Sequence, residues 1–333
     1  MVSDYPKAVA AGWHPVASLA ELGRSPLARS LMGRSLVVFR AATGPAVFFN
    51  RCPHRNMALS RGKIRDGTIE CPYHGWRFAG DGRCVLTPGA AEPAARSAET
   101  LPVVVRAGLV WTCLAPEPGP FPALPWPLED DGYDRFWWLL RPSRARLIDA
   151  IENFLDPAHP HFLHAGLVRS GSVRRPVEVT IRIGADRAEA IYVENARAAA
   201  LMPRLLEGLR SVGIGRFLPP TIGQLVFEGP AGPRLVITVF FTPTAAGEVQ
   251  PVAHFATPKG RAPAWLKRLL LKAFNGPVVV QDRAALALQS DTIEHFGAPK
   301  YALGPLDFLL PAIRQLAEGE VPDESERIVK VEL

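Results

Sequence analysis

The chain has 333 residues, 48% hydrophobic and 21% charged, so a disordered protein is excluded and about two globular domains are expected. The net charge of +6 would suit an acidic protein partner or an anionic substrate, but no basic stripe with interleaved aromatic residues is present, which argues against nucleic acid. No signal peptide is recognisable and no apolar run reaches the ~18 residues of a membrane span. We therefore expect a soluble, cytoplasmic protein without a membrane partner.

Residues up to 114 are expected to form mostly β-structure. Two β-prone runs, 35–40 and 46–49, flank a turn at Thr43-Gly44, which is the pattern of a β-hairpin. Further short strands are expected at 68–70, 75–78, 101–106 and 109–114. The sequence thus predicts a small all-β domain in which two loops interrupt the strands.

These two loops carry the strongest chemical signal in the chain. Cys52 and His54 form one pair, and Cys71 and His74 form a second pair sixteen residues later. Structural zinc sites usually pair Cys with Cys and His with His, whereas here each loop mixes the two types. The mixed loops favour a two-iron, two-sulfide cluster in which two Cys bind one iron and two His bind the other. Zinc is the alternative.

A proline-rich stretch separates the two halves of the chain. Residues 115–127 contain six prolines, which rules out a helix interior or a central strand. We expect an N-terminal domain at 1–116, a linker at 117–127 and a C-terminal domain at 128–333. The remaining cysteines, Cys84 and Cys113, are expected to be buried and reduced.

The second half is predicted to be α+β, an antiparallel sheet with helices packed against it. An extended segment at 137–147 precedes a helical segment at 149–165, which its prolines must kink or restart. Segment 201–217 is less regular and could cover a pocket. Strands are expected at 177–183, 188–194, 221–228, 234–242 and 249–256, and helices at 263–274, 277–296 and 305–316.

A second cluster of metal-binding side chains lies in the helical segment. Asp156, His159, His161 and His164 fall within nine residues. In a regular helix His159 and His164 would point about 140° apart, but the intervening prolines could let both rings converge. Oxygen-activating non-haem iron favours two His and one carboxylate. Asp282 is the best third ligand, because it lies on an apolar helical face where an unpaired carboxylate would be costly; the alternative is an ion pair with a nearby Arg.

The chain resembles the Rieske non-haem iron oxygenases, the catalytic α-subunits of aromatic-ring and demethylating oxygenase systems. The resemblance extends over nearly the whole chain and is closest to the shorter vanillate- and dicamba-type O-demethylases. It rests on Cys-Pro-His-Arg (52–55), Cys-Pro-Tyr-His-Gly-Trp (71–76), Glu-Asn-Phe-Leu-Asp-Pro-Ala-His-Pro-His-Phe-Leu-His (152–164) and Gln-Asp (281–282). It implies a Rieske domain followed by a helix-grip-like catalytic domain.

The resemblance also implies two cofactors. A [2Fe-2S] cluster would be held by Cys52, His54, Cys71 and His74, and mononuclear Fe(II) by three further side chains. These three are His159, His164 and Asp282. Asn153 stands where the family often has an asparagine near the iron, and His161 is a departure from the family pattern that we expect to point away from it.

Finally, the resemblance implies how electrons reach the iron. Asp156 would connect His159 to His74 of a neighbouring subunit, which requires a ring of subunits, commonly a homotrimer. A ferredoxin or a flavin reductase would supply electrons from NAD(P)H. The expected reaction is O2-dependent hydroxylation or O- or N-demethylation of a small, hydrophobic, aromatic substrate. Two alternatives are an electron-transfer protein with an inert C-terminal domain and a ligand-binding module whose second domain only carries a hydrophobic molecule.

Overall fold

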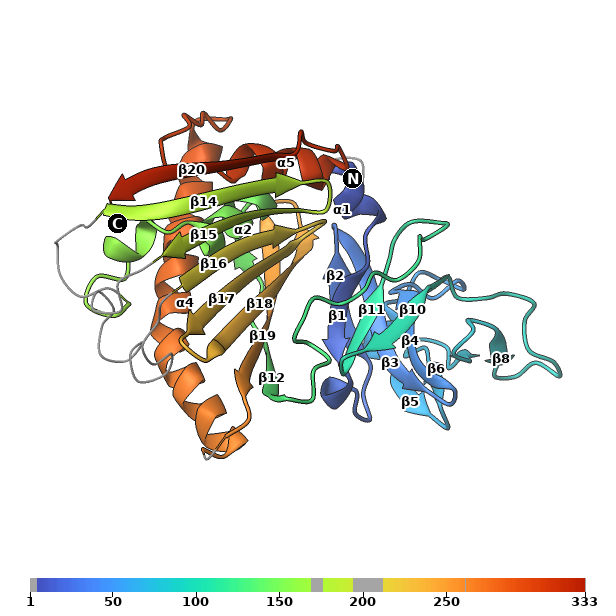
Figure 1. Ribbon diagram of the computed structural model, residues 1–333. Helices are drawn as coiled ribbons and strands as arrows, with labels where there is room; N and C mark the ends of the chain where they lie inside the picture. The colour runs from blue at the N-terminus through green and yellow to red at the C-terminus, as the bar shows by residue number, and fades with distance from the viewer. Residues whose placement is uncertain (1–4, 169–175, 194–211, 261, 333) are drawn as a thin grey trace. The chain divides into compact units, whose positions relative to one another are not determined.

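The computed structural model describes residues 5–168, 176–193, 212–260 and 262–332 (Figure 1). The chain divides into two compact units. The first consists mainly of Ala10–Ala123 and also takes in Thr242–Ala246, whereas the second contains Leu124–Phe241 and the chain from Gly247 onward, together with Pro6–Val9. The main division falls in the proline-rich stretch. No helix in the described ranges is both long and apolar enough to cross a membrane.

The first unit is built from small antiparallel sheets. The strand orders are β1-β11-β10, β2-β3-β4-β9 and β5-β6-β7-β8. Its elements are β1 (His14–Ser18), η2 (Leu19–Glu21), β2 (Leu27–Leu31), β3 (Arg34–Ala41), β4 (Gly44–Phe49), η3 (Leu59–Arg61), β5 (Lys63–Arg65), β6 (Thr68–Glu70), β7 (Arg77–Phe78), β8 (Cys84–Leu86), β9 (Thr100–Leu101), β10 (Val103–Arg106) and β11 (Leu109–Thr112). Helix α1 (Lys7–Ala11) precedes them and is divided between the two units.

Strand β3 is apolar on both faces because two hydrophobic cores meet there. Val37 and Phe39 face a core that also contains the ligand-loop cysteines. Leu36 and Val38, which point to the opposite face, belong to a second core. A strand buried on both faces is a continuous apolar run rather than an alternating one. This packing fixes the strands from which the two Cys-His loops emerge.

The second unit is a long sheet with helices on one face. Its strands follow the order β12-β19-β18-β17-β16-β15-β14-β20, and β13 also pairs with β19. The elements are β12 (Tyr133–Leu139), β13 (Ser143–Arg144), α2 (Leu147–Leu155), η4 (His159–His161), β14 (Pro176–Gly184), β15 (Arg187–Val193), β16 (Val212–Leu218), β17 (Ile222–Gly229), β18 (Gly232–Ala245), β19 (Glu248–Pro258), α4 (Ala264–His295), α5 (Leu310–Glu318) and β20 (Ser325–Glu332).

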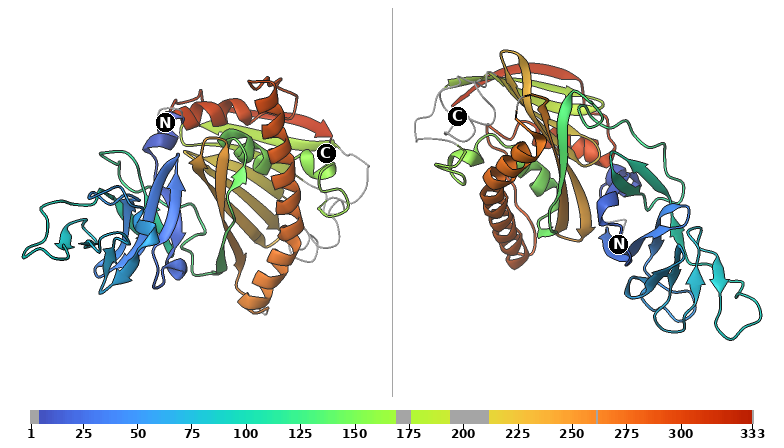
Figure 2. Two further views of the ribbon diagram at one scale, coloured as in Figure 1. Left: turned by 180° about the vertical axis from the view of Figure 1, so that it is seen from behind. Right: turned by 90° about the horizontal axis from the view of Figure 1, so that it is seen from below.

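Helix α4 runs across the face of this sheet, as both views in Figure 2 show. The two helices predicted at 263–274 and 277–296 are in fact this single helix, with Pro277 inside it. An internal proline removes one helical hydrogen bond and costs about 3 kcal/mol. Phe274 and Val278, on either side of the proline, both line the same cavity against the sheet. Tertiary packing therefore keeps the two halves in one helix.

The sheet also contains two strands that were not predicted. β16 occupies part of the segment expected to be irregular, and residues 201–211 of that segment lie outside the described residues. β16 contains Gly213 and Gly215, which lower its apparent β-propensity, yet both glycines face the cavity. β20 is a polar edge strand that pairs with β14 along its own whole length. Its exposed charged residues do not show the apolar alternation by which a strand is recognised in a sequence.

Candidate metal centres

The two Cys-His loops of the first unit have the same backbone fold. In each loop the cysteine N–H donates to the carbonyl five residues later, and the cysteine carbonyl accepts from the N–H four residues later. The bonds are Cys52 N–H to Met57 O (2.8 Å), Asn56 N–H to Cys52 O (2.9 Å), Cys71 N–H to Trp76 O (2.8 Å) and Gly75 N–H to Cys71 O (3.0 Å). Asn56 and Gly75 occupy equivalent positions with φ of 58° and 71°. The two loops thus fold alike, although the histidine follows the cysteine by two residues in one loop and by three in the other.

The ligand types separate by depth. Cys52 and Cys71 are 1% and 3% exposed, whereas His54 and His74 lie at the surface. The two imidazole rings are 4.6 Å apart between centroids, and Trp76 stacks on His54 at the same separation. A buried thiol pair with a surface imidazole pair fits a cluster that has one Cys-bound and one His-bound iron.

The electrostatics of the four side chains agree with this arrangement. Burial, reinforced by the neighbouring Cys71 sulfur, raises the pKa of the Cys52 thiol to about 11. Desolvation and the facing His74 ring lower the pKa of His54. In both cases desolvation is the larger cause, and the close approach of a group of the same type adds to the cost of the charged form. A bound metal relieves such strain, because it takes thiolates and neutral imidazoles as ligands.

In the second unit, α2 positions the first histidine. Leu147, Ile151 and Leu155 recur at helical spacing and are buried, which seats α2 against the sheet. Asp156 ends the helix with an extended backbone. Its Oδ1 accepts the Ala158 N–H at 2.8 Å and its Oδ2 accepts the His159 N–H at 3.0 Å. One carboxylate therefore ends α2 and begins the 3-10 turn η4.

Asp156 also contacts the His159 ring. Oδ2 of Asp156 lies 3.3 Å from Nδ1 of His159. Burial favours the neutral acid, but the hydrogen bonds from His159 and the Ala158 N–H outweigh it and lower the pKa of Asp156. Asp156 is therefore an anion beside an imidazole, which leaves Nε2 of that ring to face the interior.

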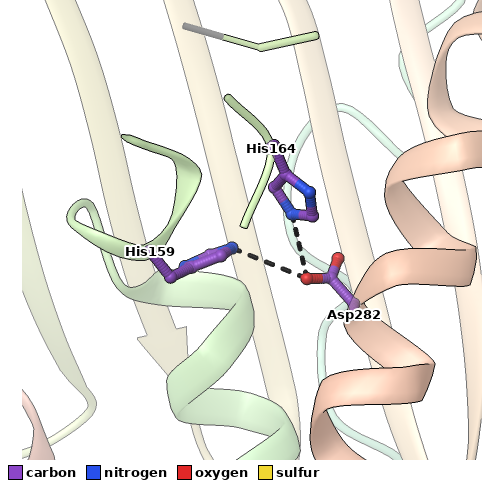
Figure 3. Close-up of side chains that lie close together, drawn as sticks. All are labelled: His159, His164 and Asp282. Atoms are coloured by element: carbon purple, nitrogen blue, oxygen red, sulfur yellow. Dashed lines mark hydrogen bonds and ion pairs between the residues drawn. The ribbon is translucent and has the colours of Figure 1, made fainter. Parts of the chain in front are cut away.

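His159, His164 and Asp282 converge on one point, as Figure 3 shows. One ligand atom from each lies within 4.8 Å of the other two. Asp282 Oδ1 is 3.0 Å from His164 Nε2 and 3.6 Å from His159 Nε2. The rings are 5.1 Å apart and nearly perpendicular. The interruption between α2 and η4 brings the histidines together, as the prolines suggested, and α4 supplies the carboxylate.

This donor set fits a mononuclear iron. Two imidazole nitrogens and one carboxylate oxygen form the facial triad of oxygen-activating iron proteins. His164 is 1% exposed, and burial alone would lower its pKa. Asp282 and Gln281, which contact opposite ring nitrogens, raise the pKa of His164 instead. His161 is not part of this group.

A cavity of about 250 Å³ opens beside the triad. Its wall is mostly aliphatic and aromatic, which suits a hydrophobic small molecule. Phe227 and Phe241 line the cavity, whereas Phe217 and Phe240 are buried elsewhere. Other lining residues include Asn153, Leu225, Ile237, Val239, Phe255, Asn275 and Val279, together with the triad. Asn275 gave no recognisable signal in the sequence.

Comparison with known proteins identifies the first unit. Residues 12–104 match the Rieske [2Fe-2S] domain. The aminopyrrolnitrin oxygenase PrnD of Pseudomonas fluorescens is 34% identical over 47% of this chain and 46% of its own length. The dicamba O-demethylase oxygenase component of Stenotrophomonas maltophilia is 28% identical over 59% of each chain. The chain spans about half the length of the first curated relatives it matches.

Solved structures share the whole architecture. Dicamba monooxygenase bound to dicamba superimposes with a TM-score of 0.80 at 20% identity, covering 93% of this chain and 96% of the other. NdmA of Pseudomonas putida CBB5 with caffeine gives a TM-score of 0.75 at 21% identity, covering 93% and 90%. At these identities the likeness establishes the fold, an N-terminal β-domain followed by an antiparallel-sheet domain.

Proposed function

Since this chain carries a Rieske [2Fe-2S] domain and is related to the oxygenase components of Rieske systems, we propose that it is itself the oxygenase component of a multicomponent Rieske non-haem iron system. The observation that carries the proposal is the convergence of His159, His164 and Asp282 beside an apolar cavity. A protein that only transferred electrons, or only carried a ligand, would have no use for this triad.

The residues divide into two cofactor sites. Cys52 and Cys71 would hold the inner iron of the cluster, and His54 and His74 would hold the outer iron. The triad would hold Fe(II). When bound, the cluster and the iron supply electron transfer and oxygen activation.

The reaction proposed is hydroxylation of a small hydrophobic substrate, or O- or N-demethylation when the hydroxylated carbon is a methyl group. The apolar cavity wall would bind the substrate and exclude water from it. Asn153 also lines the cavity, so its amide is the group we expect to orient substrate beside the metal. The names of related proteins, a dicamba O-demethylase and a chloroacetanilide N-alkylformylase, point to aromatic ethers and anilides as the first compounds to test.

Electrons would pass between copies of this chain. Asp156 is an anion held against His159, and a surface imidazole such as His74 of a neighbouring copy could donate to its carboxylate. Two large apolar side chains near the triad in sequence, Phe162 and Val280, are 68% and 67% exposed. Single exposed apolar side chains are common on protein surfaces, but these two lie beside the residues of the proposed electron path. We therefore infer a closed ring, a homotrimer, that covers them.

The electron donors would be a ferredoxin or a flavin reductase using NAD(P)H. The net charge of +6 suits an acidic redox partner. Such steering weakens as salt screens the charges, so we expect reductase-supported turnover to fall at high ionic strength.

Metal content and oxygen uptake test the proposal together. Purified protein should be red-brown, with two irons and labile sulfide in the cluster and one further iron per chain. It should consume O2 when given reductant and a methoxybenzoate, an N-methyl heterocycle or an anilide that fits the cavity. A protein with the cluster but without the further iron would support the electron-transfer alternative. Full iron loading without oxygen uptake on any of these compounds would support the ligand-binding alternative.

A further inference from the structure

His164 is held on both edges of its ring by consecutive residues of α4. Nε2 lies 3.0 Å from Asp282 Oδ1, and Nδ1 lies 2.7 Å from Gln281 Oε1. The ring itself is 1% exposed. Gln281 is at the surface of the helix, where a glutamine would ordinarily be solvated. Instead its amide reaches inward to a buried imidazole.

The two histidines of the triad have different supporting partners. Nδ1 of His159 faces the carboxylate of Asp156 at 3.3 Å, whereas Nδ1 of His164 faces a neutral amide. A metal-bound imidazole needs a partner on its second nitrogen, because that hydrogen bond fixes which nitrogen is free for the metal and how the ring is turned. Each ring therefore has a polar group facing Nδ1, a charged one at His159 and a neutral one at His164.

We propose that Gln281 is a positioning residue for the iron site. Its Oε1 accepts the Nδ1–H of His164, which keeps Nε2 free for the metal and holds the ring plane toward Asp282. This inference rests on the proposed function, since it requires a metal on His164. It assigns a role to Gln281, the first residue of the Gln-Asp pair at 281–282.

The neutrality of Gln281 also has a consequence for charge. Asp282 and the anionic Asp156 already place two negative charges near a divalent metal. A carboxylate at position 281 would keep the acceptor for Nδ1–H and add a third charge, which strengthens binding of a cation. A shorter amide or an aliphatic side chain would remove the acceptor without adding charge. Substitutions at position 281 therefore separate the contribution of the hydrogen bond to metal binding from the contribution of charge.

The experiment follows loss of mononuclear iron from the holoprotein to a ferrous chelator, with the absorbance of the cluster as an internal measure of intact protein. Variants Gln281→Leu and Gln281→Asn should release this iron about 10- to 100-fold faster than the unmodified protein. Gln281→Glu should hold it at least as tightly as the unmodified protein. Gln289→Leu, an exposed glutamine two turns away on α4, is the matched control and should show no change.

A second measurement uses Co(II) in place of iron. The ligand-field bands of bound Co(II) should change in Gln281→Leu, because the His164 ring turns. In Gln281→Glu, which keeps the acceptor for Nδ1–H, the bands should match those of the unmodified protein. Equal iron retention and equal Co(II) spectra in Gln281→Leu and the unmodified protein would overturn the inference alone. An unmodified protein that holds the cluster but neither iron nor Co(II) at the triad would contradict the proposed function instead.

Discussion

At the scale of single residues, the centre depends on a few polar contacts inside an apolar unit. Asp156 ends one helix, starts the next turn and contacts the His159 ring. A residue with three simultaneous contacts tolerates little change of shape. Asparagine has nearly the same shape as aspartate but no charge, so the Asp156→Asn variant tests the charge separately from the geometry.

Asp156→Asn should keep the fold, the cluster and the mononuclear iron, because the amide oxygen can still accept the Ala158 N–H. Loss of the charge should slow electron transfer between subunits, so reductase-supported turnover should fall by about 10- to 100-fold. Single-turnover oxidation of the cluster, followed by stopped-flow absorbance, measures this step. Oxidation at the normal rate would exclude the bridging role.

The choice between His161 and His164 as ligand can be tested in the same way. His164→Ala should lose the mononuclear iron and keep the colour of the cluster, because among the described residues only His164 joins His159 and Asp282 at one point. His161→Ala should retain both metals. Iron analysis of the two variants decides which histidine is the ligand. Loss of mononuclear iron in His161→Ala but not in His164→Ala would assign the role to His161.

At the scale of elements, close packing of α2 on the sheet positions the triad. β17 approaches α2 so closely at Gly223 that a Cβ there would lie 2.6 Å from the Phe154 ring. The absence of a side chain at Gly223 is what lets the Phe154 ring of α2 pack this closely on β17. Packing at a distance from the metal thus sets the position of its ligands.

Gly223→Ala should displace Phe154 and destabilise the second unit by about 1–3 kcal/mol, the usual cost of overpacking. Because α2 leads into η4, the variant should also bind mononuclear iron less tightly. Gly260→Ala, where a Cβ would meet open space, is the control. Thermal unfolding and iron content measure both effects, and a variant as stable as the control would show that α2 adjusts freely.

The pairing of β12 with β19 buries a histidine that should make stability depend on pH. Burial, and then the charge of Arg135, lower the pKa of His254 to about 4 from 6.5. Its ring packs edge-on against Trp137 and is 1% exposed. Because the unfolded chain takes up the proton first, the stability that the neutral ring contributes is fully present above pH 6.5 and is lost as the pH falls toward 4.

Between pH 7.5 and 5 this loss amounts to about 2 kcal/mol. His254→Leu should lower the baseline stability and remove this part of the pH dependence. Urea unfolding of both proteins at the two pH values gives the difference. Equal losses on acidification would mean that His254 does not titrate as its burial requires.

At the scale of the whole molecule, the proposed ring of subunits depends on surface that a single copy leaves exposed. Phe162→Ser and Val280→Ser should each weaken the oligomer, because they remove large apolar groups that we expect a neighbouring copy to cover. Val321→Ser is a control with a similarly exposed apolar side chain. Sedimentation at several concentrations should show smaller species only for the first two. A trimer unaffected by both would place the interface elsewhere.

The sequence by itself indicated the two metal sites proposed for this protein. Residue type and spacing were enough to recognise the two Cys-His pairs. Each pair, Cys52 with His54 and Cys71 with His74, lies within one short loop whose geometry is local. The division near the prolines and most strands of the second unit were likewise predictable from local propensity and alternation. These signals need no knowledge of distant contacts.

Only the tertiary structure decided how distant segments meet. Asp282 is more than a hundred residues from His164 in the sequence, and its place at 3.0 Å depends on α4 crossing the sheet. The same packing keeps α4 continuous at Pro277, against local helix propensity, and places the Gln281 amide against the His164 ring. Polar β20 and glycine-containing β16 became strands through pairing with their neighbours. The physical reason is common to all of these: each is stabilised by contacts with partners that no local window of sequence contains.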